Sequence, residues 1–291
     1  METTTFMQAI ISGIVTGSIY LLVALGINII FGAMRILNFA HCTYMMLAMY
    51  GGYYIYVFGG IDPYISLLIL TPLFFLGGFA TQKYFIEKVL ATNILNQIIL
   101  TVGLFITIKS LASLFFSETF RMIPVFYKTI SYSLRGVYIG LPQLVAVIVS
   151  ISLVLFLHLF LTRTDFGRMI RAASQDMYGA SVCAINVYRV FCMAFGIGTA
   201  LASVAGVLIA TYYPIYPHVG DPFLLSGFIV VVLGGLGSFK GCVVSSYIIA
   251  LTESLIAYAY IPAFQQVGSL VIFMIILLFK PKGIFGGYES K

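Results

Sequence analysis

The chain is a succession of long apolar runs separated by short polar segments. The runs fall at about residues 6–33, 41–58, 63–81, 95–116, 141–161, 190–212, 222–237, 241–260 and 263–280. Because about 20 apolar residues in a helix span the hydrocarbon core of a bilayer, each run predicts a transmembrane helix. The pattern predicts an all-α integral membrane protein, a polytopic bundle of about eight or nine spans with ten as an upper limit. The short run at 222–237 is the weakest of them.

One polar segment, residues 162–190, is long enough to lie in water, and it holds a large share of the charge. Arg168, Arg171 and Asp176 follow one another at roughly helical spacing, which predicts a short helix on the membrane surface. We interpret residues 1–291 as a single transmembrane domain in which the segment at 162–190 docks into a partner. A merely solvated connector is the alternative.

The composition excludes an ordinary soluble domain. The chain is 61% hydrophobic and 8% charged, with a mean hydropathy of +1.08, whereas soluble domains carry about 25% charged residues. We attribute the net charge of +6 to the cytoplasmic loops of a membrane protein rather than to nucleic-acid binding. Glu2 and the lack of a basic segment before the first apolar run argue against a cleaved signal peptide.

The basic residues are distributed unequally between the two sides that the predicted spans define. With residues 162–189 placed inside, the inner side holds Arg35, Lys83, Lys88, Arg163, Arg168, Arg171, Arg189, Lys240, Lys280, Lys282 and Lys291. The outer side holds Arg121, Lys128 and Arg135, all in the loop at 117–140. Since Lys and Arg gather on cytoplasmic loops, we expect a multi-pass protein of the plasma (inner) membrane with its N-terminus outside and its C-terminus in the cytoplasm.

Two interruptions of the apolar pattern are candidates for a solute path. The first covers residues 34–41, and the second runs from Pro214 to Pro222 and is followed by a glycine-rich turn at 234–241. Broken helices expose backbone polar groups, which a membrane tolerates only beside protein or a water-filled path. Ordinary re-entry turns are the alternative.

Small residues recur at four-residue spacing in two spans. Gly13 and Gly17 form a pair in the first span. The sixth span carries a stripe of Ala194, Gly198, Ala202 and Gly206. Such positions let helix backbones approach closely in lipid. We expect them to pack helices within the chain, in preference to forming a dedicated dimer face.

The sequence lacks the motifs of nucleotide-binding proteins and of common enzymes. It contains no G-x-x-x-x-G-K-[ST] and no H-E-x-x-H, and no span carries paired carboxylates. The cysteines form no C-x-x-C pair, so we expect small buried residues rather than a disulfide or a metal site. They are Cys42, Cys183, Cys192 and Cys242. The chain is therefore predicted to be no enzyme and to hold neither a catalytic nor a metal site.

Two ionisable residues, Lys109 and Glu253, fall inside predicted spans. A charge in the bilayer core is costly, so each is expected to face the bundle, a wet cavity or an interface. Lys109 lies about two turns from the outer end of its span and can extend toward that end. Glu253 is mid-span, where a role in transport and a structural hydrogen bond to a neighbouring helix both fit it.

Short motifs rich in Gly, Asn and Arg occur from the first span to the tail. They are Gly17-Ser18-Ile19-Tyr20, Ala24-Leu25-Gly26, Leu37-Asn38-Phe39-Ala40-His41, Gly167-Arg168-Met169-Ile170-Arg171-Ala172 with Asp176, Ile185-Asn186 with Arg189, Val232-Leu233-Gly234-Gly235-Leu236-Gly237-Ser238 with Gly241 and Glu253, and Pro281-Lys282-Gly283-Ile284-Phe285-Gly286. Together they resemble the LivH-type permease subunits of ABC importers for branched-chain amino acids, over nearly the whole chain. Cys42 and Ala184 depart from the family pattern, which has glycine at both positions.

The resemblance implies a complex of several chains. A second related permease would share the membrane, two cytoplasmic ATPase subunits would bind ATP and magnesium, and an extracytoplasmic solute-binding protein would meet the loops at 117–140 and 213–222. This chain would hold no cofactor, and its partners would include the lipid bilayer but no nucleic acid. By resemblance, the ATPase-coupling residues are Gly167, Arg168, Arg171, Ala172, Asp176 and Asn186. The candidates for the translocation path or its support are Asn38, His41, Gly235, Gly237, Ser238 and Glu253.

The sequence therefore predicts an ABC importer permease that moves branched-chain or other hydrophobic amino acids into the cytoplasm by alternating access. ATP hydrolysis in the separate ATPase subunits would drive the import. A permease of the same type for urea, short amides or a sugar is one alternative. A stand-alone channel or secondary carrier is another, although a proton-coupled carrier usually needs several ionisable groups in a relay and this chain has essentially one.

Overall fold

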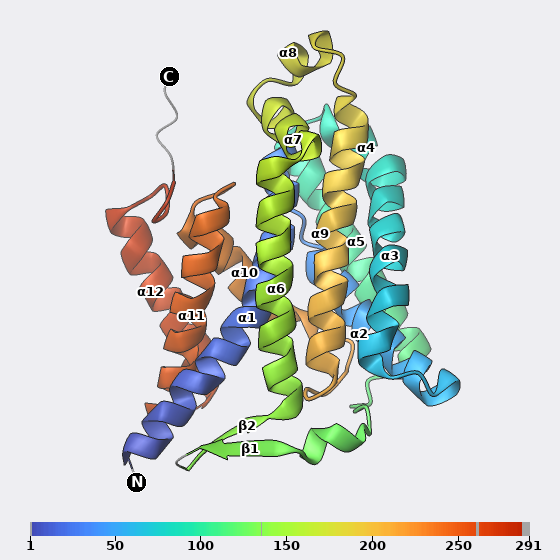
Figure 1. Ribbon diagram of the computed structural model, residues 1–291. Helices are drawn as coiled ribbons and strands as arrows, with labels where there is room; N and C mark the ends of the chain where they lie inside the picture. The colour runs from blue at the N-terminus through green and yellow to red at the C-terminus, as the bar shows by residue number, and fades with distance from the viewer. Residues whose placement is uncertain (1, 135, 260–261, 287–291) are drawn as a thin grey trace.

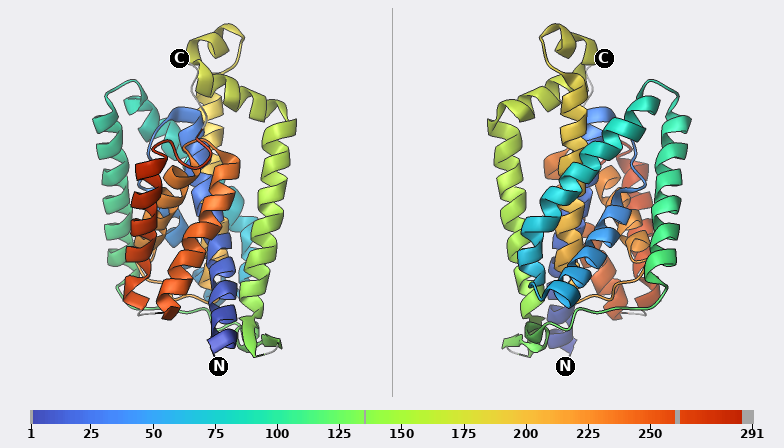
Figure 2. Two further views of the ribbon diagram at one scale, coloured as in Figure 1. Left: turned by 90° about the vertical axis from the view of Figure 1, so that its left-hand side faces the viewer. Right: turned by 90° about the vertical axis from the view of Figure 1, so that its right-hand side faces the viewer.

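The computed structural model describes residues 2–134, 136–259 and 262–286 as an elongated bundle of helices with a small hairpin at one end (Figures 1 and 2). The first half contains α1 (Glu2–Met34), α2 (His41–Gly59), α3 (Pro63–Thr81), the π-helical turn η1 (Gln82–Ile86), α4 (Glu87–Leu90), α5 (Ile94–Phe116), the 3-10 turn η2 (Phe126–Thr129), β1 (Ser131–Leu134) and β2 (Val137–Gly140). The second half contains α6 (Leu141–Arg163), α7 (Asp165–Gln175), α8 (Met177–Val182), α9 (Val187–Ala210), α10 (Gly220–Gly234), α11 (Phe239–Ala259), the 3-10 turn η3 (Pro262–Phe264) and α12 (Gln265–Phe279). Every apolar run predicted as a span contains a helix.

Seven helical segments within the described ranges are long and apolar enough to cross a membrane. They are α1 from Thr4, the segment from α3 to α4, α5, α6, α9, α11 and α12 with the turn before it. α10 has 15 residues, so it is about 22 Å long and shorter than the roughly 30 Å hydrocarbon core. α2 has 19 residues but is rich in Tyr and Gly and falls outside this set. More than half of the residues of α2 and of α10 are buried in the bundle.

α1, blue in Figure 1, crosses the bundle and packs against α9, α10 and α11, with α6 alongside. The glycine pair predicted in this helix faces α11. A Cβ at Gly13 would lie 3.0 Å from the Cα of Leu251, and one at Gly17 would lie 2.7 Å from Cδ1 of Tyr247. The pair therefore brings two helices of the same chain together.

The small-residue stripe of α9 is buried along its whole length. A Cβ at Gly198 would lie 2.9 Å from the carbonyl oxygen of Gly26 on α1, and one at Gly206 would overlap the carbonyl group of Met45 on α2. On the side facing α3, Thr199 donates a 2.8 Å hydrogen bond to the carbonyl oxygen of Phe74. The prediction that the stripe packs helices of the same chain together is confirmed, since it contacts α1 and α2.

The two ends of the bundle differ. α4, α7 and α8 lie at one end, while the N-terminal end of α1 and the β1–β2 hairpin lie at the other (Figure 1). The strands pair antiparallel, with Ser131 opposite Gly140, and Gly136 in the turn has a φ of 84°. The sequence analysis did not predict this hairpin, because each strand has four residues and no extended alternation. Of the basic residues used to predict orientation, Arg135 and Lys291 lie outside the described residues.

Three of the four cysteines are buried, as predicted, but Cys183 is exposed. Cys183 follows the last residue of α8, a helix that projects from the end of the bundle (Figure 2). The expectation of burial was wrong at this position because the segment at 162–190 packs little apolar surface around it.

Candidate functional site

The second predicted break joins the loop at 117–140 at the end of the bundle opposite α7. The amide of Arg121 donates to the carbonyl oxygen of Ile215 at 2.9 Å, and the amide of Ile215 donates back at 2.8 Å. The rings of Phe120 and Tyr216 pack beside this bridge, with centroids 4.9 Å apart. The two loops predicted to meet a solute-binding protein are thus joined to each other.

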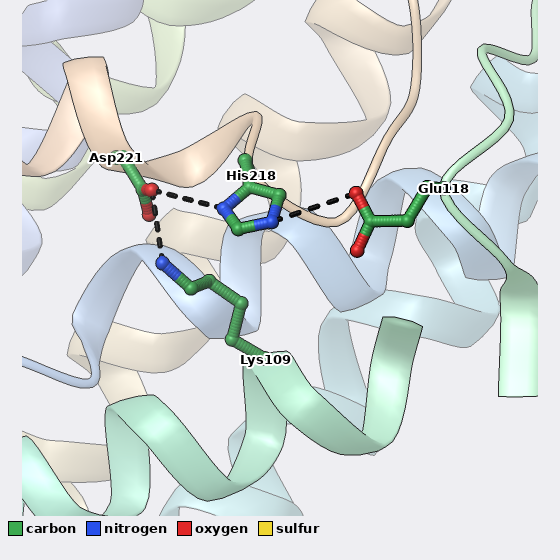
Figure 3. Close-up of polar contacts among 4 residues, drawn as sticks. All are labelled: Lys109, Glu118, His218 and Asp221. Carbon is green, nitrogen blue, oxygen red and sulfur yellow. Dashed lines mark hydrogen bonds and ion pairs between the residues drawn. The ribbon is translucent and has the colours of Figure 1, made fainter. Parts of the chain in front are cut away.

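Three residues close in sequence to this bridge, Glu118, His218 and Asp221, form a charged cluster with Lys109 (Figure 3). Lys109 of α5 places its Nζ 3.0 Å from Oδ2 of Asp221, which lies in the first turn of α10. His218 stands between two carboxylates, with Nδ1 3.4 Å from Asp221 and Nε2 3.5 Å from Glu118. The side chain of Lys109 is only 21% exposed. Its charge is therefore paired with Asp221 in a partly buried position.

The Lys109–Asp221 pair predicts a non-additive effect on stability. Lys109→Met leaves the carboxylate without its ammonium partner, and we expect a loss between the roughly 1 kcal/mol of an exposed pair and the roughly 3 kcal/mol of a buried one. Adding Asp221→Asn removes the second charge and should recover part of that loss. Thermal unfolding of the purified single and double variants measures the coupling. If the stability lost in the double variant equals the sum of the losses in the two single variants, the interaction between Lys109 and Asp221 contributes nothing to stability.

The first predicted break is irregular and brings two predicted path residues into the interior. The side chain of Asn38 accepts a 3.1 Å hydrogen bond from the amide of Ala40, and His41 begins α2. The ring of His41 is fully buried against Gly26 of α1, where a Cβ would lie 2.6 Å from its Cε1. Asn38 and His41 are enclosed by their own chain.

Glu253 is the buried centre of a three-helix contact. Its carboxylate accepts a 2.7 Å hydrogen bond from the hydroxyl of Tyr20 on α1 and a 3.1 Å hydrogen bond from the hydroxyl of Ser226 on α10. Because Glu253 itself lies on α11, the carboxylate joins α1, α10 and α11. Both hydrogen bonds fit one of the two roles expected for Glu253, a structural hydrogen bond to a neighbouring helix.

The glycine-rich turn between α10 and α11 depends on backbone conformations that favour glycine. Gly235 and Gly237 have φ values of 97° and 84°, a region that costs other residues energy. The amide of Gly237 donates to the side chain of Asn28 on α1 at 2.8 Å. The hydroxyl of Ser238 accepts from the amide of Gly241 at 3.1 Å, which caps the start of α11. These predicted path residues shape a turn held against α1.

The tail, residues 281–286, forms hydrogen bonds with the end of α10 that precedes the glycine-rich turn. The amide of Ile284 donates to the carbonyl oxygen of Leu233 at 2.8 Å, and the amide of Phe285 donates to that of Gly234 at 3.2 Å. Both acceptors belong to the last turn of α10, where the carbonyl groups have no partner within the helix. The late glycine motif and the tail motif, separate in sequence, thus form one structural unit.

The segment at 162–190 begins with a tight corner between α6 and α7. A Cβ on Gly167 would overlap the carbonyl group of Leu161 in α6, so this position requires glycine. The guanidinium of Arg171 donates to the same carbonyl oxygen at 2.6 Å. Arg168 pairs with Asp165 on the exposed side of α7. Gly167 and Arg171 therefore fix the corner, while Arg168 is presented to solvent.

The segment contains two short helices instead of the single short helix predicted through Arg168, Arg171 and Asp176. The amide of Asp176, the residue after α7, donates a 3.1 Å hydrogen bond to the carbonyl oxygen of Ala172. Asp176 then leaves the helical conformation, with a φ of −148°, and its carboxylate caps α8 by accepting a 2.9 Å hydrogen bond from the amide of Tyr178. The prediction failed because a side chain that accepts from the backbone favours a helix start over a helix interior.

The turn from α8 to α9 has the hydrogen bonds of a Schellman motif. The amide of Ile185 donates to the carbonyl oxygen of Ala180 at 3.1 Å, and the amide of Ala184 donates to that of Ser181 at 3.1 Å. Ala184 occupies the left-handed position of the motif, with a φ of 59°. Asn186 follows and caps α9 through a 3.0 Å hydrogen bond from an amide in its first turn. Alanine therefore stands where the backbone favours glycine.

Ala184→Gly is expected to stabilise the turn by about 1 kcal/mol, because it removes the cost of holding a Cβ in the left-handed region. The side chain is exposed, so no packing is lost. Thermal unfolding and the rate of proteolytic cleavage between α8 and α9 measure the gain. The matched control is Ala200→Gly in the interior of α9, which should lose about 1 kcal/mol. Equal losses in both variants would contradict the prediction.

Comparison with known proteins identifies the family. A family model described as "Branched-chain amino acid transport system / permease component" matches residues 9–279. The chain belongs to this permease family. Among its members, the high-affinity branched-chain amino acid transport system permease protein BraD of Pseudomonas aeruginosa is 27% identical over 98% of this chain and 97% of its own length. The probable branched-chain amino acid transport permease protein LivH of Methanocaldococcus jannaschii is 29% identical over 94% of this chain and 90% of its own.

A solved structure extends the likeness to the fold. PsaBC from Streptococcus pneumoniae in complex with Fab contains a chain that is 14% identical, with a TM-score of 0.52. The match covers 96% of this chain and 93% of that chain. Membership of the permease family and the helical bundle together confirm the predicted resemblance and the predicted all-α, multi-pass membrane fold.

The sequence analysis missed the charged cluster around Asp221, His218 and Glu118. Charged residues are common in loops and at helix ends, so these three carried no distinctive pattern. One signal was available, since a lysine inside an apolar span requires a partner. The partner lies 112 residues away from Lys109 in the chain, and only the folded bundle brings the two together.

Proposed function

We propose that this chain is the permease subunit of an ATP-driven importer for branched-chain or other hydrophobic amino acids. The family match over residues 9–279, whose description names branched-chain amino acid transport, carries the proposal. The names of both relatives point to the same solutes. In this proposal the bundle alternates between outward-open and inward-open states. ATP and magnesium are bound by separate subunits, because the sequence has no motif for a bound nucleotide.

α7 and α8 are suited to receive the motion of the ATPase subunits. They project beyond the end of the bundle (Figure 2), and the exposed side chain of Arg168 offers a positive charge to a partner. The corner at Gly167 leaves no free space between α7 and α6. A displacement of α7 is therefore transmitted to a helix long enough to span the membrane.

This assignment sets the orientation and the remaining partners. The end with α7 and α8 faces the cytoplasm, so the N-terminus lies outside the plasma (inner) membrane and the C-terminus lies inside. The surface around the Arg121–Ile215 bridge then faces the extracytoplasmic solute-binding protein. A second related permease subunit completes the membrane part, and two ATPase subunits complete the cytoplasmic part.

Purification from native membranes tests the proposal. We expect two ATPase subunits and a second permease to co-purify with the chain. The reconstituted complex with its solute-binding protein should accumulate leucine in liposomes only when ATP is present on the α7 side. A chain that purifies alone and still moves leucine would contradict the proposal. Uptake of ribose or urea in place of leucine would leave the permease assignment intact and overturn the solute class.

A further inference from the structure

A large cavity opens at the α7 end of the bundle. Its volume is about 1500 Å³, and its walls come from the ends of α1 and α6, from α7, from the turn between α10 and α11, and from the tail. Four basic side chains line it, and none of the described residues in the lining is acidic. They are Arg35, Arg171, Lys240 and Lys282. Among the described residues of the lining, the charged side chains are therefore all basic, and His158 is either neutral or cationic.

Two of these cations have no ion-pair partner in the part of the chain that the structure describes. No carboxylate there lies within 4.0 Å of Arg171 or Lys240. Arg171 uses one guanidinium nitrogen to bind the carbonyl oxygen of Leu161, and a guanidinium has further N–H donors. That bond fixes Arg171 at the rim of the cavity. A ligand that offers several anionic oxygens satisfies the donors of both side chains.

An apolar slot continues from the cavity toward the middle of the bundle. It has a volume of about 330 Å³ and lies between α6 and α11, with Leu21 of α1 also lining it. Its walls include Ile151 and Leu155 of α6. His158 and Phe239, whose ring centroids are 5.2 Å apart, line both the cavity and the slot. Ile151 lies about 10 Å along α6 from His158. The slot therefore reaches about two turns into the apolar part of the helix.

We propose that the cavity and the slot together bind one anionic phospholipid, with the phosphate group among Arg171 and Lys240 and an acyl chain along Ile151 and Leu155. A basic pocket between membrane helices is a preferred site for acidic headgroups. The apolar continuation matches an attached hydrocarbon chain and matches no free anion. An amino acid zwitterion is favoured by a carboxylate beside its ammonium group, and the described residues of the lining include no carboxylate.

The bound lipid contacts the corner between α6 and α7 at Gly167. Gly167, Ile170 and Arg171 of α7 line the same cavity as the end of α6. A lipid seated there bridges α7 and α6 on the side away from α9. This site rests on the chain being in a membrane and not on the identity of the imported solute, so a failure of the proposed function leaves its test unaffected.

Native mass spectrometry of the purified full-length chain tests the site. The probes are phosphatidylglycerol and phosphatidylcholine with the same acyl chains, and inorganic phosphate. The wild-type chain should retain phosphatidylglycerol roughly tenfold more strongly than phosphatidylcholine. Arg171→Gln/Lys240→Gln should reduce the retention of phosphatidylglycerol to the level of phosphatidylcholine. The control Lys83→Gln/Lys88→Gln removes two charges outside the cavity and should leave the preference unchanged.

A second pair of variants tests the slot. Leu155→Trp fills it and should lower the retention of phosphatidylglycerol at least fivefold, whereas Leu68→Trp on the exposed face of α3 should have no effect. Inorganic phosphate at millimolar concentration should not displace the lipid. Complete displacement by phosphate would overturn the lipid assignment in favour of a free-anion site. An unchanged preference in Arg171→Gln/Lys240→Gln would overturn the site itself.

Discussion

Gly198→Leu is expected to prevent stable assembly of the bundle, at a cost of about 3 kcal/mol or more. The reason lies in the crossing of α1 and α9, where a single Cβ at this position would already lie 2.9 Å from the carbonyl oxygen of Gly26 and 2.6 Å from Ile30. A leucine adds three more carbon atoms beyond that Cβ. The backbone of α1 cannot move aside without also disturbing α10 and α11, which pack on it. Thermal unfolding and the yield of folded protein in mild detergent measure the loss.

The matched control for this variant is Gly77→Leu. Gly77 also lies in a long helix, α3, but no atom lies within 4 Å of the position its Cβ would take. In lipid an exposed leucine at this site is tolerated, and replacing a helical glycine stabilises a helix by up to about 1 kcal/mol. Similar stability of the Gly198→Leu and Gly77→Leu variants would show that α1 and α9 do not require a glycine at their crossing.

Arg168→Glu is expected to lower ATP-driven uptake at least about tenfold while leaving the amount of protein in the membrane unchanged. A reversed charge at a docking surface places like charges together, which costs several kcal/mol of binding free energy, and about 1.4 kcal/mol corresponds to a factor of ten. The side chains of Arg168 and Asp165 are 68% and 85% exposed, so the pair between them contributes little to the fold. Uptake in vesicles and co-purification of the ATPase subunits are the two measurements.

Two further variants separate docking from folding. Arg163→Glu reverses an exposed charge at the end of α6 and should retain uptake, because Arg163 lies outside α7. Arg171→Glu removes the hydrogen bond to Leu161 and should lower both stability and uptake. Normal co-purification of ATPase subunits with Arg168→Glu would refute the assignment of α7 as their docking surface.

The helices could be predicted from the sequence because a bilayer imposes a length and a composition on each of them. The apolar runs at 63–81 and 141–161 reappear as α3 and α6 with almost the same bounds. The small-residue stripe of α9, which includes Gly198, could also be predicted, since in lipid the small residues of a helix mark where another backbone approaches. Each of these signals is local in the chain.

The site could be predicted only in part, because its contacts join residues that are distant in sequence. The partner of Lys109 is Asp221, and the partners of Glu253 are Tyr20 and Ser226. Nothing in the spacing of a single chain selects these pairs over others. The division of α7 from α8 at Asp176 had a local cause, since an aspartate competes with the helix for a backbone amide. That signal was present in the sequence and was not used.

The contact between the tail and α10 has a consequence for the order in which the protein matures. Ile284 and Phe285 supply the donors for the buried last turn of α10, yet a ribosome makes them only after α11 and α12. Until then, α10 is a short helix whose final carbonyl groups lack these partners. Insertion of the earlier helices can proceed during synthesis, but closure of this part of the bundle has to await the last residues made. We therefore expect a chain that ends before Ile284 to unfold at a lower temperature than the full-length chain, because the last turn of α10 loses both donors.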